Sequence, residues 1–150
     1  MTIVAIICFP VFKIHGLAQS KPDSTKFKKS EDEDLQLTKI KSNNLHAAIC
    51  IVTCKRSKEL SRLLKSIENI NVPFDDSNLL ILIADNDKEL SAREIWENHS
   101  EETRFSTQYV SEPQPGIPFV RNRALNSLPQ NIKNAIFVDY DEIVNENWLK

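Results

Sequence analysis

The sequence lacks several features that would place it in a simple functional class. Its 19 basic and 21 acidic residues leave a net charge of −2, so no global positive field is present to attract nucleic acid or an anionic membrane. The three cysteines, Cys8, Cys50 and Cys54, have no CxxC spacing, and the three histidines are scattered. This pattern indicates neither a disulfide framework nor a zinc site, and it favours a reducing, cytoplasmic environment. Because the net charge is close to zero, any phosphate site must be formed by a local group of basic residues.

The N-terminal region also lacks a long hydrophobic run. The apolar stretch Met1–Phe12 is shorter than the ~20 residues of a transmembrane helix, and it lacks the positive residues that usually open a secretory signal. The alternative is that this stretch is a signal peptide or the remnant of a membrane anchor. In the second case the protein would be attached peripherally to the membrane. Residues 21–44 are rich in charge and cannot bury enough apolar area to offset their ordering entropy. We therefore expect a hydrophobic segment and disordered linker over residues 1–44, followed by one domain over residues 45–150.

Apolar runs alternate with amphipathic segments along the rest of the chain. The first two runs are continuous and rich in β-branched or aliphatic residues, as in strands covered on both faces of a parallel sheet. The predicted strands are residues 47–53, 79–84, 108–110 and 135–138. The predicted helices run from a capping Ser57 to about Asn71, from Glu89 to Glu97, and from Pro118 in a first turn to Leu128. This alternation predicts a doubly wound α/β layer with a mainly parallel sheet flanked by helices.

Two aspartates follow the last predicted strand. Asp139 and Asp141 are two residues apart, and like charges at that spacing repel each other unless a cation lies between them. Mg²⁺ and Mn²⁺ favour oxygen ligands and leave coordination positions open for substrate phosphates. The pair therefore predicts a Mg²⁺ or Mn²⁺ site completed by a diphosphate. The alternative is an ordinary strand end in solvent.

Four other residues are candidates for binding a nucleotide. Thr53 can contact a base or serve as a turn residue, and Asp85 can accept from a base or ribose or cap the next helix. The guanidinium groups of Arg56 and Arg121 match diphosphate oxygens, with surface ion pairs as the alternative. Because the carboxyl ends of parallel strands meet at one edge, we expect Thr53, Asp85 and Asp139 to face a common crevice.

Four sequence blocks resemble glycosyltransferase family 2 in their order and spacing. They are IVTCKR at 51–56, IADND at 83–87, GIPFVRNRAL at 116–125 and FVDYDE at 137–142. The resemblance covers about residues 46–149, including the Trp148–Leu149 pair after the acidic motif. It implies a Rossmann-like half-domain of the GT-A type, the nucleotide-sugar-binding N-terminal half of the family, apparently truncated. Cys54 stands where the family usually has an aromatic residue, and Tyr140 replaces a common aspartate.

The resemblance also implies an enzymatic activity. It is a metal-dependent, inverting transfer of a sugar from a nucleotide-diphosphate donor, often a uridine one, to an acceptor hydroxyl of a glycan or lipid-linked molecule. By similarity, Thr53 and Asp85 bind the nucleoside, Arg121 lies against the donor, and Asp139 and Asp141 form the metal-binding Asp-x-Asp. The family's catalytic base comes later, so we expect it beyond Lys150. An inactive nucleotide-binding remnant or interaction module is the second interpretation, and an α/β domain without a nucleotide is the third.

Overall fold

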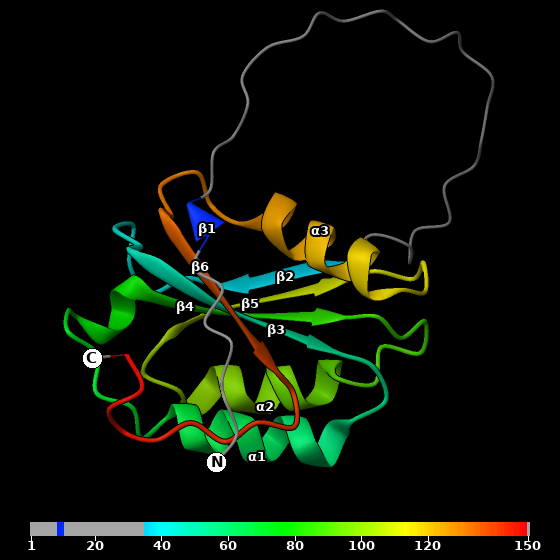
Figure 1. Ribbon diagram of the computed structural model, residues 1–150, viewed down its shortest axis with the longest axis horizontal. Helices are drawn as coiled ribbons and strands as arrows, with labels where there is room; N and C mark the ends of the chain where they lie inside the picture. The colour runs from blue at the N-terminus through cyan, green and yellow to red at the C-terminus, as the bar shows by residue number, and fades with distance from the viewer. Residues whose placement is uncertain (1–8, 11–34, 150) are drawn as a thin grey trace, which may run out of the picture.

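The computed structural model describes residues 9–10 and 35–149, and the predictions for residues 1–8 and 11–34 lie outside this part of the chain (Figure 1). The strands are β1 (Phe9–Pro10), β2 (Gln36–Lys39), β3 (Ala47–Thr53), β4 (Leu79–Asp85), β5 (Ser106–Ser111) and β6 (Asn134–Asp139). The helices are α1 (Ser57–Ile67), α2 (Arg93–Glu102) and α3 (Ile117–Ser127), with a 3₁₀ turn at Asp76–Asn78. None of the helices in the described part is both long and apolar enough to span a membrane.

The strands form one sheet in the order β1-β6-β3-β4-β5-β2. The four strands β6, β3, β4 and β5 are parallel, whereas β1 and β2 are antiparallel to their neighbours at the two edges. The chain runs outward from β3 through β4 to β5, and α3 then returns it to the other side of β3, where β6 lies. This reversal creates a topological switch point at the carboxyl ends of β3 and β6, the place where open α/β sheets usually bind ligands.

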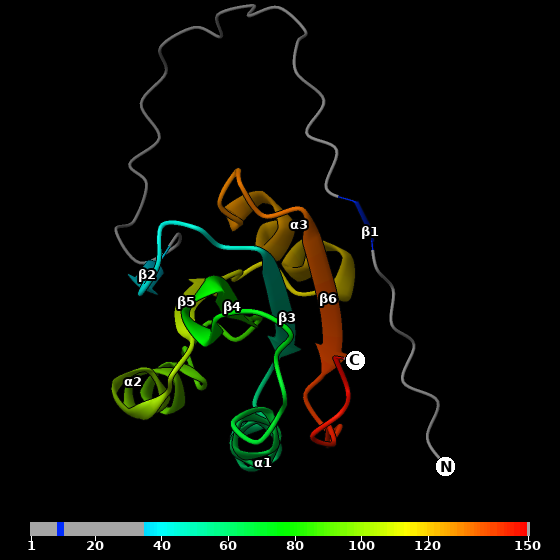
Figure 2. The same cartoon turned by 90° about the vertical axis from the view of Figure 1, so that its left-hand side faces the viewer.

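Helices cover both faces of the sheet, as the doubly wound prediction requires. Figure 2 shows α1 and α2 on one face and α3 on the other. Every residue of β4, the strand between β3 and β5, is buried, which explains its continuous apolar sequence. Successive side chains of a strand point to opposite faces, so Ile49 and Ile51 pack with α1 and α2, while Ala48 and Cys50 pack with α3. The predicted α/β class is therefore confirmed.

The local predictions differ in accuracy. Strand β3 has the predicted bounds, and the four buried residues of α1 are the predicted Leu60, Leu63, Leu64 and Ile67. Helix α1 ends at Ile67, earlier than predicted, because the following residues form tighter i→i+3 bonds and bury Ile70. Ser57 is the first helical residue rather than the cap, which is Arg56, and its hydroxyl donates to the Ser91 carbonyl at 3.2 Å.

Helix α2 begins at Arg93, so its predicted start at Glu89 was wrong. The side chain of Asp87 accepts a hydrogen bond from the Glu89 N–H at 3.2 Å. Leu90 then adopts a positive φ of 55°, which interrupts a helical path. Local side-chain bonding thus turns the predicted first turn of the helix into a loop.

Strand β2 was also missed, because it lies in the stretch predicted to be a linker. Its sequence QLTK alternates between exposed and half-buried positions, and it pairs antiparallel with β5. Leu35 and Leu37 pack against the core on the α1 side, and the Lys41 N–H donates to Ser106 Oγ at 2.9 Å. Residues 35–44 therefore belong to the folded unit, and its start at Leu45 is corrected.

Candidate functional site

A pocket of about 290 Å³ lies at the switch point between β3 and β6. Its lining includes four of the six predicted site residues, namely Thr53, Arg56, Arg121 and Asp139. These residues come from the end of β3, the turn after it, helix α3 and the end of β6. The fold thus brings together side chains that are up to 86 positions apart in the sequence, from Thr53 to Asp139.

Arg121 and Asp139 form an ion pair in the lining of this pocket, which is the alternative considered for this arginine. The Arg121 Nη2 atom lies 3.7 Å from the Asp139 Oδ1 atom, and the guanidinium carbon lies 5.4 Å from the centre of the Phe137 ring. The ring contact orients the guanidinium, whose buried Nε has no hydrogen-bond partner. The Asp139 side chain is 67% exposed, so its carboxylate remains accessible to a ligand. With Arg56, the pocket carries two cationic groups and one carboxylate, which suits a diphosphate accompanied by a cation.

Thr53 lines the same pocket and has an unpartnered hydroxyl. The residue is only 2% exposed, and its Oγ1 atom has no hydrogen-bond partner in the structure. Buried polar atoms are normally hydrogen-bonded, and an exception at a functional site indicates a position that a ligand or solvent completes. The Thr53 side chain is in phase with Ile49 and Ile51, so it points toward the α1 and α2 face, and its hydroxyl is available only to a molecule that reaches that side of the strand end.

Asp85 is placed differently from the expectation that it would face the crevice, because it does not line the pocket. Its Oδ2 atom accepts from the Ala92 N–H at 2.8 Å and from the Tyr109 hydroxyl at 3.0 Å. Its Oδ1 atom accepts from the Asp87 N–H at 3.1 Å. Burial raises the pKa of the Asp85 carboxyl, and these hydrogen bonds partly offset the shift. Asp85 thus ties the end of β4 to the start of α2, close to the capping role that we considered as its alternative.

Asp141 also lies outside the pocket lining, on the turn after β6, where it is exposed. That turn is closed by a hydrogen bond from the Glu142 N–H to the Asp139 carbonyl at 3.1 Å. Among residues 9–10 and 35–149, no group of three or more histidine, cysteine, aspartate or glutamate side chains is placed to hold a metal ion. The two exposed carboxylates fit a divalent cation only in a site where phosphate oxygens supply further ligands.

Six lining residues were not assigned a function from the sequence, and three of them come from α3 and the end of β4. Ile117 and Val120 form an apolar wall on α3, and Asn86 lies at the end of β4. Helix α3 has no acidic residue in its first turn and no side-chain cap, so its N-terminal end presents an uncompensated partial positive charge near the pocket. Periodicity along α3 predicts that Val120 is buried, but only the position of the helix over β3 shows what it lines.

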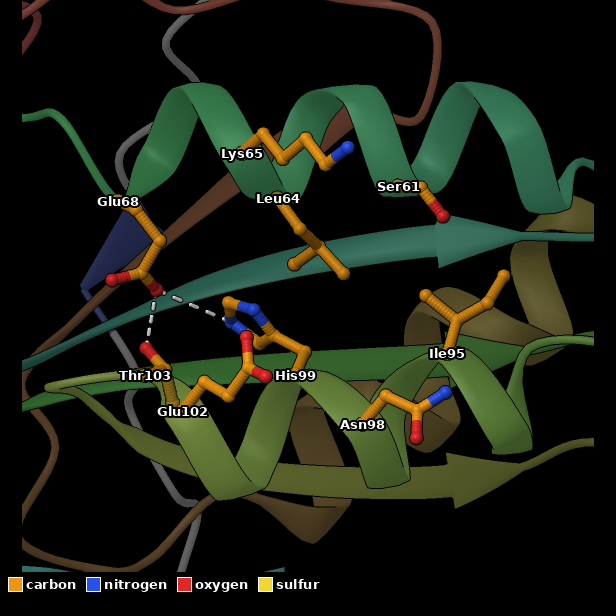
Figure 3. Close-up of a pocket in the computed structure, with 9 residues that line it drawn as sticks. All are labelled: Ser61, Leu64, Lys65, Glu68, Ile95, Asn98, His99, Glu102 and Thr103. Carbon is orange, nitrogen blue, oxygen red and sulfur yellow. Dashed lines mark hydrogen bonds and ion pairs between the residues drawn. The ribbon is translucent and has the colours of Figure 1, made fainter.

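A second pocket, of about 390 Å³, lies between α1 and α2 and contains none of the predicted site residues (Figure 3). Figure 3 shows the Glu68 carboxylate between Thr103, whose hydroxyl donates to it, and His99, whose Nε2 atom lies 3.5 Å away. Burial lowers the pKa of His99, and the nearby Glu68 opposes this shift. The contacts join the two helices to each other, which is a structural function.

The fold and the first pocket together define a class of protein. A doubly wound sheet with a cationic pocket and exposed carboxylates at the switch point is typical of α/β domains that bind nucleotides. No family model matches the sequence.

Comparison with known proteins narrows this class. The succinoglycan biosynthesis protein ExoM of Rhizobium meliloti (strain 1021) is 35% identical over 108 residues, which are 72% of this chain and 34% of that protein. Two crystal structures of S. aureus TarS share the fold. The structure of residues 1–349 has a TM-score of 0.56 at 19% identity over 68% of this chain and 29% of that chain. The other has a TM-score of 0.51 at 20% identity over 69% of this chain and 18% of that chain.

The chain spans about a third of the length of the curated relative that it matches, 34% of it. Together with the four motif blocks and the sheet topology, these similarities support the resemblance of the described chain to an N-terminal half of the glycosyltransferase family 2 type. The resemblance drawn from the sequence is therefore confirmed.

Proposed function

We propose that the pocket at the switch point binds the donor of a glycosyltransferase, a nucleoside-diphosphate sugar, with uridine diphosphate as its leaving group. The observation that carries the proposal is the convergence of Arg56, Arg121, Asp139 and Thr53 in the lining of one pocket. Two guanidinium groups suit diphosphate oxygens, and the hydroxyl suits the nucleoside. The pocket between α1 and α2 contains none of these residues.

In this proposal, the reaction is an inverting transfer to an acceptor hydroxyl of a glycan or lipid-linked molecule. Arg121, held over the Phe137 ring, orients the diphosphate, and Asp139 and Asp141 hold the accompanying Mg²⁺ or Mn²⁺. When bound, the cation neutralises charge that develops on the departing diphosphate. The described residues thus position the donor and stabilise its leaving group.

The experiment is a calorimetric titration of the full 150-residue chain with uridine diphosphate, with and without Mn²⁺. We expect binding that depends on the metal. The Asp139→Asn and Asp141→Asn variants should each bind at least about tenfold more weakly, since a contact to a charged group contributes ~1.5–3 kcal/mol.

The matched control is Glu94→Gln, which removes one exposed negative charge from the first turn of α2, on the far side of the sheet. It should bind like the wild type. A folded wild-type chain that binds no nucleoside diphosphate in the presence of either metal would refute the donor-site proposal. Equal binding by all four proteins would refute the assignment of the two aspartates.

A further inference from the structure

Asn86 forms hydrogen bonds to residues on both sides of the pocket. It follows β4 directly, and its backbone N–H donates to the Thr53 carbonyl at 2.8 Å, which holds it against the end of β3. Its carbonyl accepts a long contact from Cys54 Sγ at 3.5 Å. The backbone of Asn86 is thus fixed to the side of the pocket that carries Thr53.

The side chain of Asn86 reaches the opposite side. Its Nδ2 atom donates to the carbonyls of Glu112 and Gln114 at 2.6 and 2.7 Å, and its Oδ1 atom accepts from the Gly116 N–H at 2.9 Å. Both amide protons and the amide oxygen are therefore engaged by one loop, residues 112–116. That loop contains two prolines, which supply no N–H, so its carbonyls depend on a donor from elsewhere.

Gly116 links the Asn86 side chain to the start of α3. It has a φ of 133°, a conformation that residues with a side chain rarely adopt, and a Cβ placed there would lie 3.1 Å from the Phe119 ring. Its carbonyl accepts from the N–H groups of Phe119 and Val120 and so begins the helix. The first turns of α3 carry Val120 and Arg121, which form one wall of the pocket.

We propose that Asn86 is a positioning residue that sets the separation between the two walls of the donor pocket. One wall contains Thr53, and the other contains Arg121. Asn86 bonds to the backbone of the first and, through residues 112–116, to the start of the helix that carries the second. This inference rests on the proposed function for its effect on ligand affinity, but its effect on the loop is independent of any ligand.

The test compares Asn86→Ala with Asn131→Ala in the full chain. Asn131 is a matched control, because its Nδ2 atom also donates to two backbone carbonyls, those of Asn43 and Leu45, both at 3.3 Å. These bonds lie before the start of β3, so they are at the amino-terminal ends of the parallel strands, whereas the pocket is at the carboxyl ends. The readouts are amide hydrogen exchange at Gly116, the free energy of unfolding, and the affinity for uridine diphosphate with Mn²⁺.

In Asn86→Ala we expect exchange at Gly116 to rise about tenfold relative to amides of β4, and the affinity to fall about tenfold, whereas Asn131→Ala should change neither. Asn86→Asp keeps an acceptor for Gly116 but loses both donors, so its affinity should also fall while Gly116 stays protected. This second variant preserves the test if the alanine variant does not fold.

The outcomes separate this inference from the donor assignment. Unchanged exchange at Gly116 in Asn86→Ala overturns the inference, as does unchanged affinity in a protein whose wild type binds the nucleotide. If the wild type binds no nucleotide but Gly116 loses protection in Asn86→Ala, the donor assignment fails and the structural connection through Asn86 stands.

Discussion

The two faces of the sheet are packed in different ways. The face under α1 and α2 is filled with large side chains, including Trp96, Phe105 and Tyr109. The face under α3 is covered by one helix and contains small residues such as Ala84 and Ala124. The pocket lies on the α3 side, where Val52 and Phe137 remain partly exposed. The α1 and α2 face therefore buries the larger side chains, while the more thinly covered α3 face leaves room for a ligand.

The largest effect should come from removing a large side chain on the α1 and α2 face. Leu63 is fully buried there, so Leu63→Ala should lower the free energy of unfolding by ~3 kcal/mol, through lost transfer energy and a residual cavity. On the α3 face, Cys50→Ala removes a single sulfur and should cost only ~1 kcal/mol. Urea denaturation measures both. Equal losses, although fewer atoms are removed at Cys50, would show that the α3 face is packed at least as tightly as the other.

An intermediate effect is expected at Asp85, which lies on the α1 and α2 face. Asp85→Asn removes acceptors from the Ala92 N–H and the Tyr109 hydroxyl, and should cost ~1–3 kcal/mol at neutral pH. The affinity for uridine diphosphate should change less than in the pocket variants, because Asp85 does not line the pocket. A large selective loss of affinity at unchanged stability would instead assign Asp85 to nucleoside binding.

The stability difference between the wild type and Asp85→Asn should depend on pH. The folded-state pKa of Asp85 is raised above its ordinary value of 3.8, chiefly by burial, so the folded state binds this proton more tightly than the unfolded state. The wild type should therefore gain stability relative to Asp85→Asn as the pH falls from neutral through the raised pKa, and the difference should level off below the ordinary pKa. Urea denaturation over that pH range measures the change. A difference that shrinks on acidification would contradict the direction of the shift.

The smallest change in stability is expected at Thr53, on the wall of the pocket. Thr53→Val replaces a buried, unpartnered hydroxyl with a methyl group of similar size, so the free energy of unfolding should change by less than ~0.5 kcal/mol. Affinity for uridine diphosphate should nevertheless fall about fivefold, since one hydrogen bond to the ligand is lost, worth ~1 kcal/mol. Thr107→Val is the control, because Thr107 Oγ1 is also buried without a partner but lies within β5. Identical affinities in the two variants would count against a contact from Thr53.

Much of the fold could be predicted from the sequence, because burial on both faces leaves a clear pattern. Strands β3 and β4 are continuous apolar runs, and their positions were predicted to within one residue. Strand β2 depends on pairing with β5, a tertiary contact that its charged surroundings do not indicate. The start of α2 depends on hydrogen bonds from Asp85 and Asp87, which compete with helix formation at Glu89.

The site was partly predictable for a similar reason. Strand ends in a parallel sheet share one edge, which correctly grouped Thr53 with Asp139. Which face of that edge holds the pocket depends on where α3 crosses the sheet, and the local sequence does not specify this. Asp85 is in phase with Ile81 and Ile83, so its side chain points to the α1 and α2 face. The bonds of Asn86 depend on its closeness to residues 112–116, which only the folded chain reveals.

The chain beyond β6 turns away from the pocket and fastens itself to α1. The Val144 N–H donates to Ser66 Oγ at 3.2 Å, and the Asn71 N–H donates to the Glu146 carbonyl at 2.7 Å. Trp148 and Leu149 pack against the core on that side. In mechanical terms, residues 140–143 form a short span fixed at both ends, by the sheet and by α1. The backbone of the acidic turn is therefore held between the sheet and α1, so a displacement of this backbone toward a ligand would strain its hydrogen bonds to the α1 region.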